Sequence, residues 1–155
     1  MAKGVSLSFL QGQGVDDLLR VFDRMDPKEQ KKIATKVTRA GAKVMVPTIK
    51  SLAPIDFEGE RDGKHLVDTI KVKALKRSRN TVGSWVRTGS ASELGIAPDE
   101  GYYPAHVELG FTRKDGSTVP AQSYMRAGFD IKKEAAFKVM GVGLFKELKK
   151  KWLAK

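Results

Sequence analysis

Two long stretches with apolar residues at helical spacing constrain the fold of this chain more than any other feature. The first starts at Asp26, which can cap a helix. Pro27 then suits the first helical position, and Glu29 follows three residues after the cap, as in a capping box. Over roughly 25 residues an apolar stripe follows, made of Ile33, Val37, Ala40, Val44 and then Ile49 or Leu52. Because a proline removes one backbone hydrogen bond, Pro47 is predicted to kink or end this helix.

A second long helix is predicted at the C-terminal end, from about Ser123. Apolar residues recur there about every four positions, namely Met125, Phe129, Ala136, Met140, Leu144, Leu148 and Trp152. The terminal lysines suit the negative end of the helix dipole. Gly141 and Gly143 interrupt the pattern, and each costs about 1 kcal/mol relative to alanine. We therefore expect these glycines to permit close contact with another helix, or a bend.

Short strands are predicted between the two helices. Residues 69–74 alternate between apolar and polar side chains, and the turn at 78–80 leads into a second strand over 81–88, which gives a basic hairpin. Residues 105–111 alternate as well, and a tight turn follows at 114–117. The fold class is therefore α+β, with a small antiparallel sheet, a meander, packed against a long kinked helix and a long C-terminal helix.

The remaining segments complete a single domain over residues 1–155, a length that can bury a core. A short strand over 5–9 and a short helix over 15–25 precede the first long helix. The segments 54–64 and 89–101 are rich in glycine and acidic residues, so we expect them to be mobile loops.

Charge is the strongest signal in the composition: 29 basic residues against 18 acidic ones give a net charge of +11. Such a chain attracts acidic partners, either nucleic acid or an acidic protein face. Residues 28–43 hold six basic side chains and one acid, and residues 71–87 hold six basic side chains and no acid. In contrast, residues 88–112 hold four acids and no lysine or arginine. A basic run is most often a solvated face, but this segregation of sign favours a role in binding.

Residues that could carry catalysis are few. The chain has no cysteine, which excludes disulfides, thiol catalysis and cysteine-based zinc sites. His106 and Glu108 form a His-x-Glu pair, but the zinc deaminases that use such a pair also need two cysteines. The sequence contains no Walker motif, nucleophile elbow or dinucleotide fingerprint. We therefore expect no enzymatic activity, no cofactor and no metal site.

Two parts of the chain carry a recognisable pattern. Residues 102–112 read Tyr-Tyr-Pro-Ala-His-Val-Glu-Leu-Gly-Phe-Thr, and residues 119–127 read Val-Pro-Ala-Gln-Ser-Tyr-Met-Arg-Ala. Upstream, Leu-Ala-Pro-Ile-Asp at 52–56 is followed by Leu-Val-Asp-Thr-Ile-Lys-Val at 66–72. Together they resemble a phage tail-component family, the tail-completion or head–tail joining proteins of lambdoid and related long-tailed phages. The residues that match the family motif are Tyr103, His106, Glu108, Gly110, Pro120, Tyr124 and Arg126.

The resemblance implies a structural virion protein of the head–tail junction, assembled in the host cytoplasm and without catalytic residues. It also implies a ring, of six copies by the symmetry of tails, that contacts neighbouring neck and tail-tube proteins. DNA passing through the lumen is a further partner, contacted without sequence specificity, and no membrane partner is expected. In this motif Glu108 and Gly110 are expected to set a turn that docks the sheet against the last helix, which Pro120 and Tyr124 anchor.

A second hypothesis is a basic nucleic-acid-binding accessory protein, in which the hairpin over 71–87 grips phosphate and Trp85 stacks on a base. In the ring hypothesis, the same hairpin meets the acidic stretch of the next copy in a heterologous contact. The residues predicted for that contact are Lys71, Lys73, Arg79, Trp85, Glu93, Asp99, Glu100 and Tyr103. The sequence leaves both hypotheses open, and also the choice among tail completion, tail terminator and head-side stopper.

Overall fold

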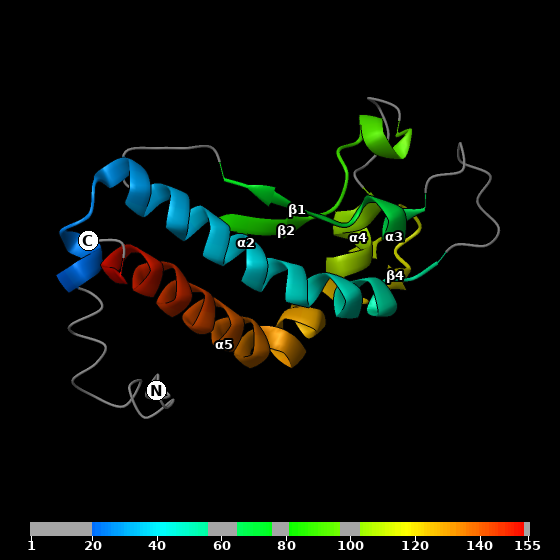
Figure 1. Cartoon of the computed structure of the whole chain (residues 1–155). Helices are drawn as coiled ribbons and strands as arrows, with labels where there is room; N and C mark the ends of the chain where they lie inside the picture. The colour runs from blue at the N-terminus through cyan, green and yellow to red at the C-terminus, as the bar shows by residue number, and fades with distance from the viewer. Residues whose placement is uncertain (1–19, 56–64, 76–80, 97–102, 154–155) are drawn as a thin grey trace.

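The computed structural model describes residues 20–55, 65–75, 81–96 and 103–153. Two long helices, α2 (Pro27–Leu52) and α5 (Tyr124–Leu153), lie side by side and run in opposite directions (Figure 1). Between them in sequence come α3 (Leu66–Thr69), β1 (Lys71–Ala74), β2 (Ser84–Arg87), the 3-10 helix η2 (Ser92–Leu94), α4 (Tyr103–Leu109), β3 (Phe111–Thr112) and β4 (Thr118–Val119). The β1–β2 hairpin lies along α2, and the α+β prediction is confirmed.

The helix α2 begins where the sequence predicts. The Asp26 carboxylate accepts a hydrogen bond from the Lys28 amide at 2.8 Å, and Pro27 occupies the first helical position. The carboxylate thereby satisfies one of the amides that a first helical turn leaves unpaired. Pro47 lies inside the helix, which continues to Leu52, so the proline does not end it.

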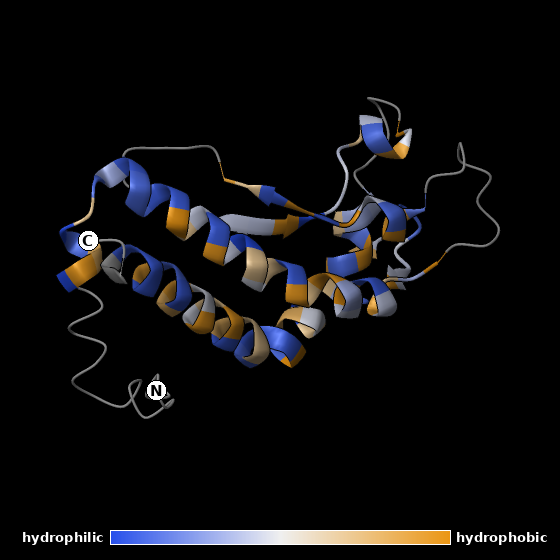
Figure 2. Cartoon of the chain, viewed as in Figure 1, coloured by the Kyte–Doolittle hydropathy of each residue, from blue (hydrophilic) through white to orange (hydrophobic). Residues whose placement is uncertain are grey.

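The core consists of two clusters of buried side chains, both of which include residues of α2. One cluster, at the end where α2 finishes and α5 begins, comprises Ile49, Ala53, Leu66, Ile70 and Tyr124. The other, toward the opposite end, comprises Ile33, Val37 and Leu148. Along both helices apolar positions alternate with polar ones, as expected when one side of a helix is buried (Figure 2).

Two glycines permit the close approach of α2 and α5. A Cβ atom at Gly41 would lie 2.5 Å from Cγ of Met140, and one at Gly128 would lie 2.4 Å from Cγ1 of Ile49. Both distances are shorter than non-bonded carbon atoms can approach, so a side chain at either position would force the packing to shift.

The close contact predicted at Gly141 and Gly143 is not found. A Cβ atom at Gly141 would meet nothing within 4 Å, and one at Gly143 would make an ordinary van der Waals contact at 3.7 Å. Gly143 therefore faces Val37 of α2 but leaves room for a side chain, so neither glycine is needed for the two helices to approach closely.

The strands form two separate antiparallel sheets, and the prediction of one meander is wrong. β1 pairs with β2, with Lys73 opposite Trp85, which confirms the basic hairpin. β3 pairs with β4 around the predicted turn at 114–117. Thr69, expected in the first strand, is the last residue of α3 and is buried.

The strand predicted over 105–111 is also wrong, because Tyr103–Leu109 form the helix α4. Tyr103 and Val107, four positions apart, both pack against the core cluster around Ile49, whereas Leu109 is exposed. Burial thus follows the helical period. In so short a segment the apolar and polar residues also alternate as they do in a strand. The sequence therefore cannot distinguish the helical period from the strand period here.

Several predictions fall outside the described residues: the strand over 5–9, residues 15–19 of the helix over 15–25, and the segments 56–64 and 97–101. Of the predicted first helix, residues 20–23 are helical. In the described part of 89–101, η2 brings Leu94 into a buried position, so this part is a packed turn.

Candidate interaction surfaces

The C-terminal end of α4 caps the start of α5. The Glu108 carboxylate accepts hydrogen bonds from the backbone amides of Met125, at 2.8 Å, and Arg126, at 3.1 Å. These are the second and third residues of α5, and amides at these positions have no partner within their own helix. The negative charge also faces the positive end of the helix dipole. Glu108 therefore stabilises the start of the last helix from a position distant in sequence.

Gly110 makes the tight turn after α4 possible. Its φ of 70° lies in the left-handed region. A Cβ atom there would lie 2.7 Å from the carbonyl oxygen of Val119 and 2.8 Å from the amide nitrogen of Ala121, so glycine is required. The amide of Gln122 donates to the carbonyl oxygen of Val107 at 2.8 Å, which fixes the segment before α5 against α4.

The other residues of the motif divide between the core and the surface. Tyr124 is buried, and Tyr103 packs against the same cluster. His106 is exposed, and its ring centre lies 5.0 Å from that of an aromatic residue in β3. Pro120 and Arg126 are exposed. The motif therefore builds a structural joint between α4, β3 and α5.

The basic hairpin is linked to the acidic stretch within one copy of the chain. Glu93, in η2, accepts hydrogen bonds from Lys71, from Arg87 at 3.1 Å and from the Ser90 amide at 2.8 Å. The bond from Lys71, followed by that from Ser90, lowers the pKa of the Glu93 carboxyl to about 2. Lys71 and Glu93, both predicted to contact a neighbouring copy, are thus partners of each other. The charged residues of that prediction that lie outside the described residues are Arg79, Asp99 and Glu100.

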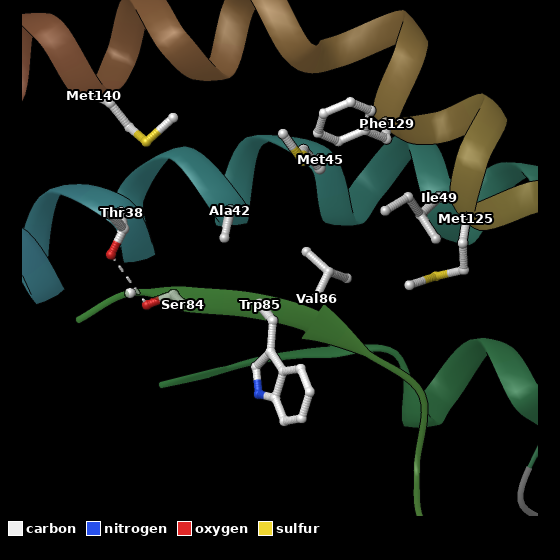
Figure 3. Close-up of a pocket in the computed structure, with 11 residues that line it drawn as sticks. Thr38, Ala42, Met45, Ile49, Ser84, Trp85, Val86, Met125, Phe129 and Met140 are labelled. Carbon is white, nitrogen blue, oxygen red and sulfur yellow. Dashed lines mark hydrogen bonds between the residues drawn. The ribbon is translucent and has the colours of Figure 1, made fainter. Parts of the chain in front are cut away.

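Trp85 stands on the outer face of the hairpin, where it is 49% exposed. Its indole points away from α2, whereas Val86 points toward α2 (Figure 3). Lys73, also exposed, lies opposite Trp85 in the strand register. An apolar groove of about 330 Å³ lies between β2 and the two helices, with Met45 and Phe129 among its lining residues. The outer face of the hairpin therefore combines an aromatic ring with an exposed cation.

The helix α5 has a second apolar side besides the one packed on α2. Ala136, Met140 and Leu148 belong to the packed side. The second side, named here the outer stripe of α5, consists of Ile131, Ala135, Val139 and Val142, all of them exposed. Their spacing of four, four and three residues places them on one side of the helix. This spacing is visible in the sequence, but the helix prediction rested on the other stripe and did not include these residues.

A family model with the description "Bacteriophage HK97-gp10, putative tail-component" matches residues 16–110, which is more than half of the chain. The chain belongs to this family of phage tail components. The resemblance inferred from the motifs is therefore confirmed at the level of the family. No curated protein and no solved structure shows a significant match.

The match to the tail-component family includes both upstream segments, 52–56 and 66–72, and ends at Gly110. Glu108 and Gly110, which cap and turn the chain toward α5, thus lie inside the matched region. The segment 119–127, which meets them in space, follows it. A tail component is a part of the virion, which agrees with the location expected from the sequence.

Within residues 20–55, 65–75, 81–96 and 103–153, the acidic and histidine side chains do not gather in groups of three or more that could hold a metal ion. In the same part of the chain, each helix is too short or too polar to cross a membrane.

Proposed function

We propose that this tail component is a structural, non-catalytic protein of the head–tail junction that completes the tail as a ring of identical copies. Membership of the tail-component family supports a role in the tail. The motifs resemble those of tail-completion and head–tail joining proteins. The ring is supported by the surfaces of the subunit. The observation that carries this part of the proposal is the outer stripe of α5.

In an isolated subunit the outer stripe is in contact with water. Ile131 is 60% exposed, Val139 38% and Val142 50%. A helix on the surface of a single domain normally has one apolar side, toward the core, and an exposed apolar patch marks a protein contact. Complete burial of a side chain of this size is worth about 1.5–3 kcal/mol, so covering three half-exposed ones would contribute about 3 kcal/mol.

A ring needs two different surfaces on each copy, because its contacts are heterologous. We assign the outer stripe of α5 to one side of the contact and the outer face of the hairpin, with Trp85 at its centre, to the other. The hairpin and α5 lie on different sides of α2 (Figure 1). Charged residues at the rim, Lys73 among them, set the register and contribute about 1 kcal/mol or less per pair.

Size-exclusion chromatography with light scattering tests the ring. The protein should form an oligomer, and the double variant Ile131→Asp, Val142→Asp should be monomeric, because a charge in a buried contact needs a partner. Trp85→Ser should weaken the same oligomer from the other side. Ile55→Ser removes an equally exposed apolar side chain outside both surfaces and serves as the matched control. A wild-type protein that stays monomeric, both alone and with purified tails, would overturn the ring.

A further inference from the structure

One side of α2 carries a regular row of basic side chains. The members, spaced by four, four, three, four and seven residues, are Lys28, Lys32, Lys36, Arg39, Lys43 and Lys50. At 3.6 residues per turn they fall within an arc of about 80°, and at 1.5 Å per residue they extend over about 33 Å. This set is named here the basic row of α2.

Among the described residues, most charges of the basic row have no acidic partner. Lys36 forms an ion pair with Glu147 of α5 at 2.8 Å. The single acid in α2, Glu29, is bound by Lys151 of α5. Throughout the described part of the chain, no ion pair reaches the other five members of the row. Five exposed or half-exposed cations therefore face solvent along one line.

The side chains in the middle of the row leave an open space between them. A shallow depression of about 610 Å³ is lined by Lys32, Thr35, Lys36, Arg39, Ala40 and Lys43. Four cationic side chains thus surround one hollow. Phosphate groups fit such a surface, because both lysine and arginine form charge-assisted hydrogen bonds to phosphate oxygens.

A second copy of the chain, which is itself strongly basic, is a poor electrostatic match for this row. Each copy has a net charge of +11, and Glu93 and Glu147 are already bound by lysines of their own chain. The complementary surface is therefore a polyanion from outside. Duplex DNA carries one negative charge per about 1.7 Å of its axis, so a row of about 33 Å meets several phosphates.

The composition of α2 favours double-stranded DNA over single-stranded DNA as the partner. The helix contains no aromatic residue, whereas proteins that bind single strands stack the bases on aromatic side chains. The hairpin is less suited than α2 to bind phosphate, because Lys71 and Arg87 both form ion pairs with Glu93. We infer that the basic row of α2 binds the phosphate backbone of double-stranded DNA without reading its sequence. This inference goes beyond the ring and does not depend on it.

Fluorescence anisotropy with short labelled duplexes of two unrelated sequences tests the inference, over about 50–200 mM NaCl. Both duplexes should bind alike. The triple variant Lys32→Gln, Arg39→Gln, Lys43→Gln should flatten the slope of log K against log salt by about 2.7, at about 0.9 per lost contact, and weaken binding at low salt about tenfold or more. The matched control removes three exposed cations outside the basic row and outside both proposed ring surfaces: Arg24→Gln, Arg113→Gln, Lys114→Gln.

The control should retain most of the wild-type affinity and slope. Equal losses in the two triple variants would mean that net charge alone attracts DNA, and would overturn the inference. Tighter binding of single strands than of duplex would overturn it as well. Unchanged DNA binding in the α2 variant, together with loss of the oligomer, would also overturn the inference. It would show that the basic row is a contact between subunits. Equal melting temperatures of both variants would confirm that each is folded.

Discussion

Replacement of Glu108 by alanine should destabilise the protein through the start of one helix. The change removes the acceptor of the Met125 and Arg126 amides, which lie 2.8 and 3.1 Å from the carboxylate oxygens. Loss of a helix cap costs about 1 kcal/mol, and loss of a negative charge at the positive end of the dipole adds about 0.3–1 kcal/mol. We therefore expect the free energy of unfolding to fall by about 1.3–2 kcal/mol. At about 2–4 °C per kcal/mol, this lowers Tm by about 3–8 °C.

Urea denaturation and calorimetry measure this loss. Glu108→Gln keeps one acceptor oxygen and the length of the side chain, so it should lose about half as much. Glu134→Ala, at an exposed position of α5, is the control and should change the free energy by less than about 0.5 kcal/mol. A loss below about 0.5 kcal/mol for Glu108→Ala would show that Glu108 is not an effective cap, because water would then satisfy the two amides equally well.

Two glycine substitutions test the helix packing, and one pH titration tests the link between the hairpin and η2. Gly128→Ala should lower the free energy of unfolding by about 1–3 kcal/mol, because its Cβ would lie 2.4 Å from Ile49. Gly141→Ala should raise the free energy of unfolding by up to about 1 kcal/mol, because nothing lies within 4 Å of the new Cβ atom and alanine favours the helix. If urea denaturation gave the same change for both variants, the contact between Gly128 and Ile49 would be contradicted. By NMR, the Glu93 carboxyl should titrate near 2, below its ordinary pKa of 4.5. Its stabilising bond with Lys71 is then fully present above 4.5 and is lost as the pH falls toward 2; a midpoint near 4.5 would show that the bond does not form in solution.

The long helices could be predicted from sequence because their signals are local. Asp26 and Pro27 cap and open α2 within three residues, and the apolar stripes of both helices repeat over many turns. A repeated period is hard to mistake for anything else. In contrast, α4 has 7 residues, and its helical burial was hidden behind an alternating pattern.

The contacts that define the candidate site could not be predicted, because they join positions far apart in sequence. Glu108 caps a helix 17 residues away, and Glu93 bonds to Lys71 across 22 residues. The sequence predicted that opposite charges meet, but it could not show whether they meet within one copy or between two. Which glycines face the neighbouring helix likewise depends on how two helices are rotated, and this is set by packing.

We propose that this tail component completes the tail at the head–tail junction. Negative-stain imaging of particles made without the protein tests it most directly. The account predicts DNA-filled heads without tails beside free tails, and restoration of joined particles when purified protein is added. Complete particles, with tails attached to heads in the absence of the protein, would contradict it.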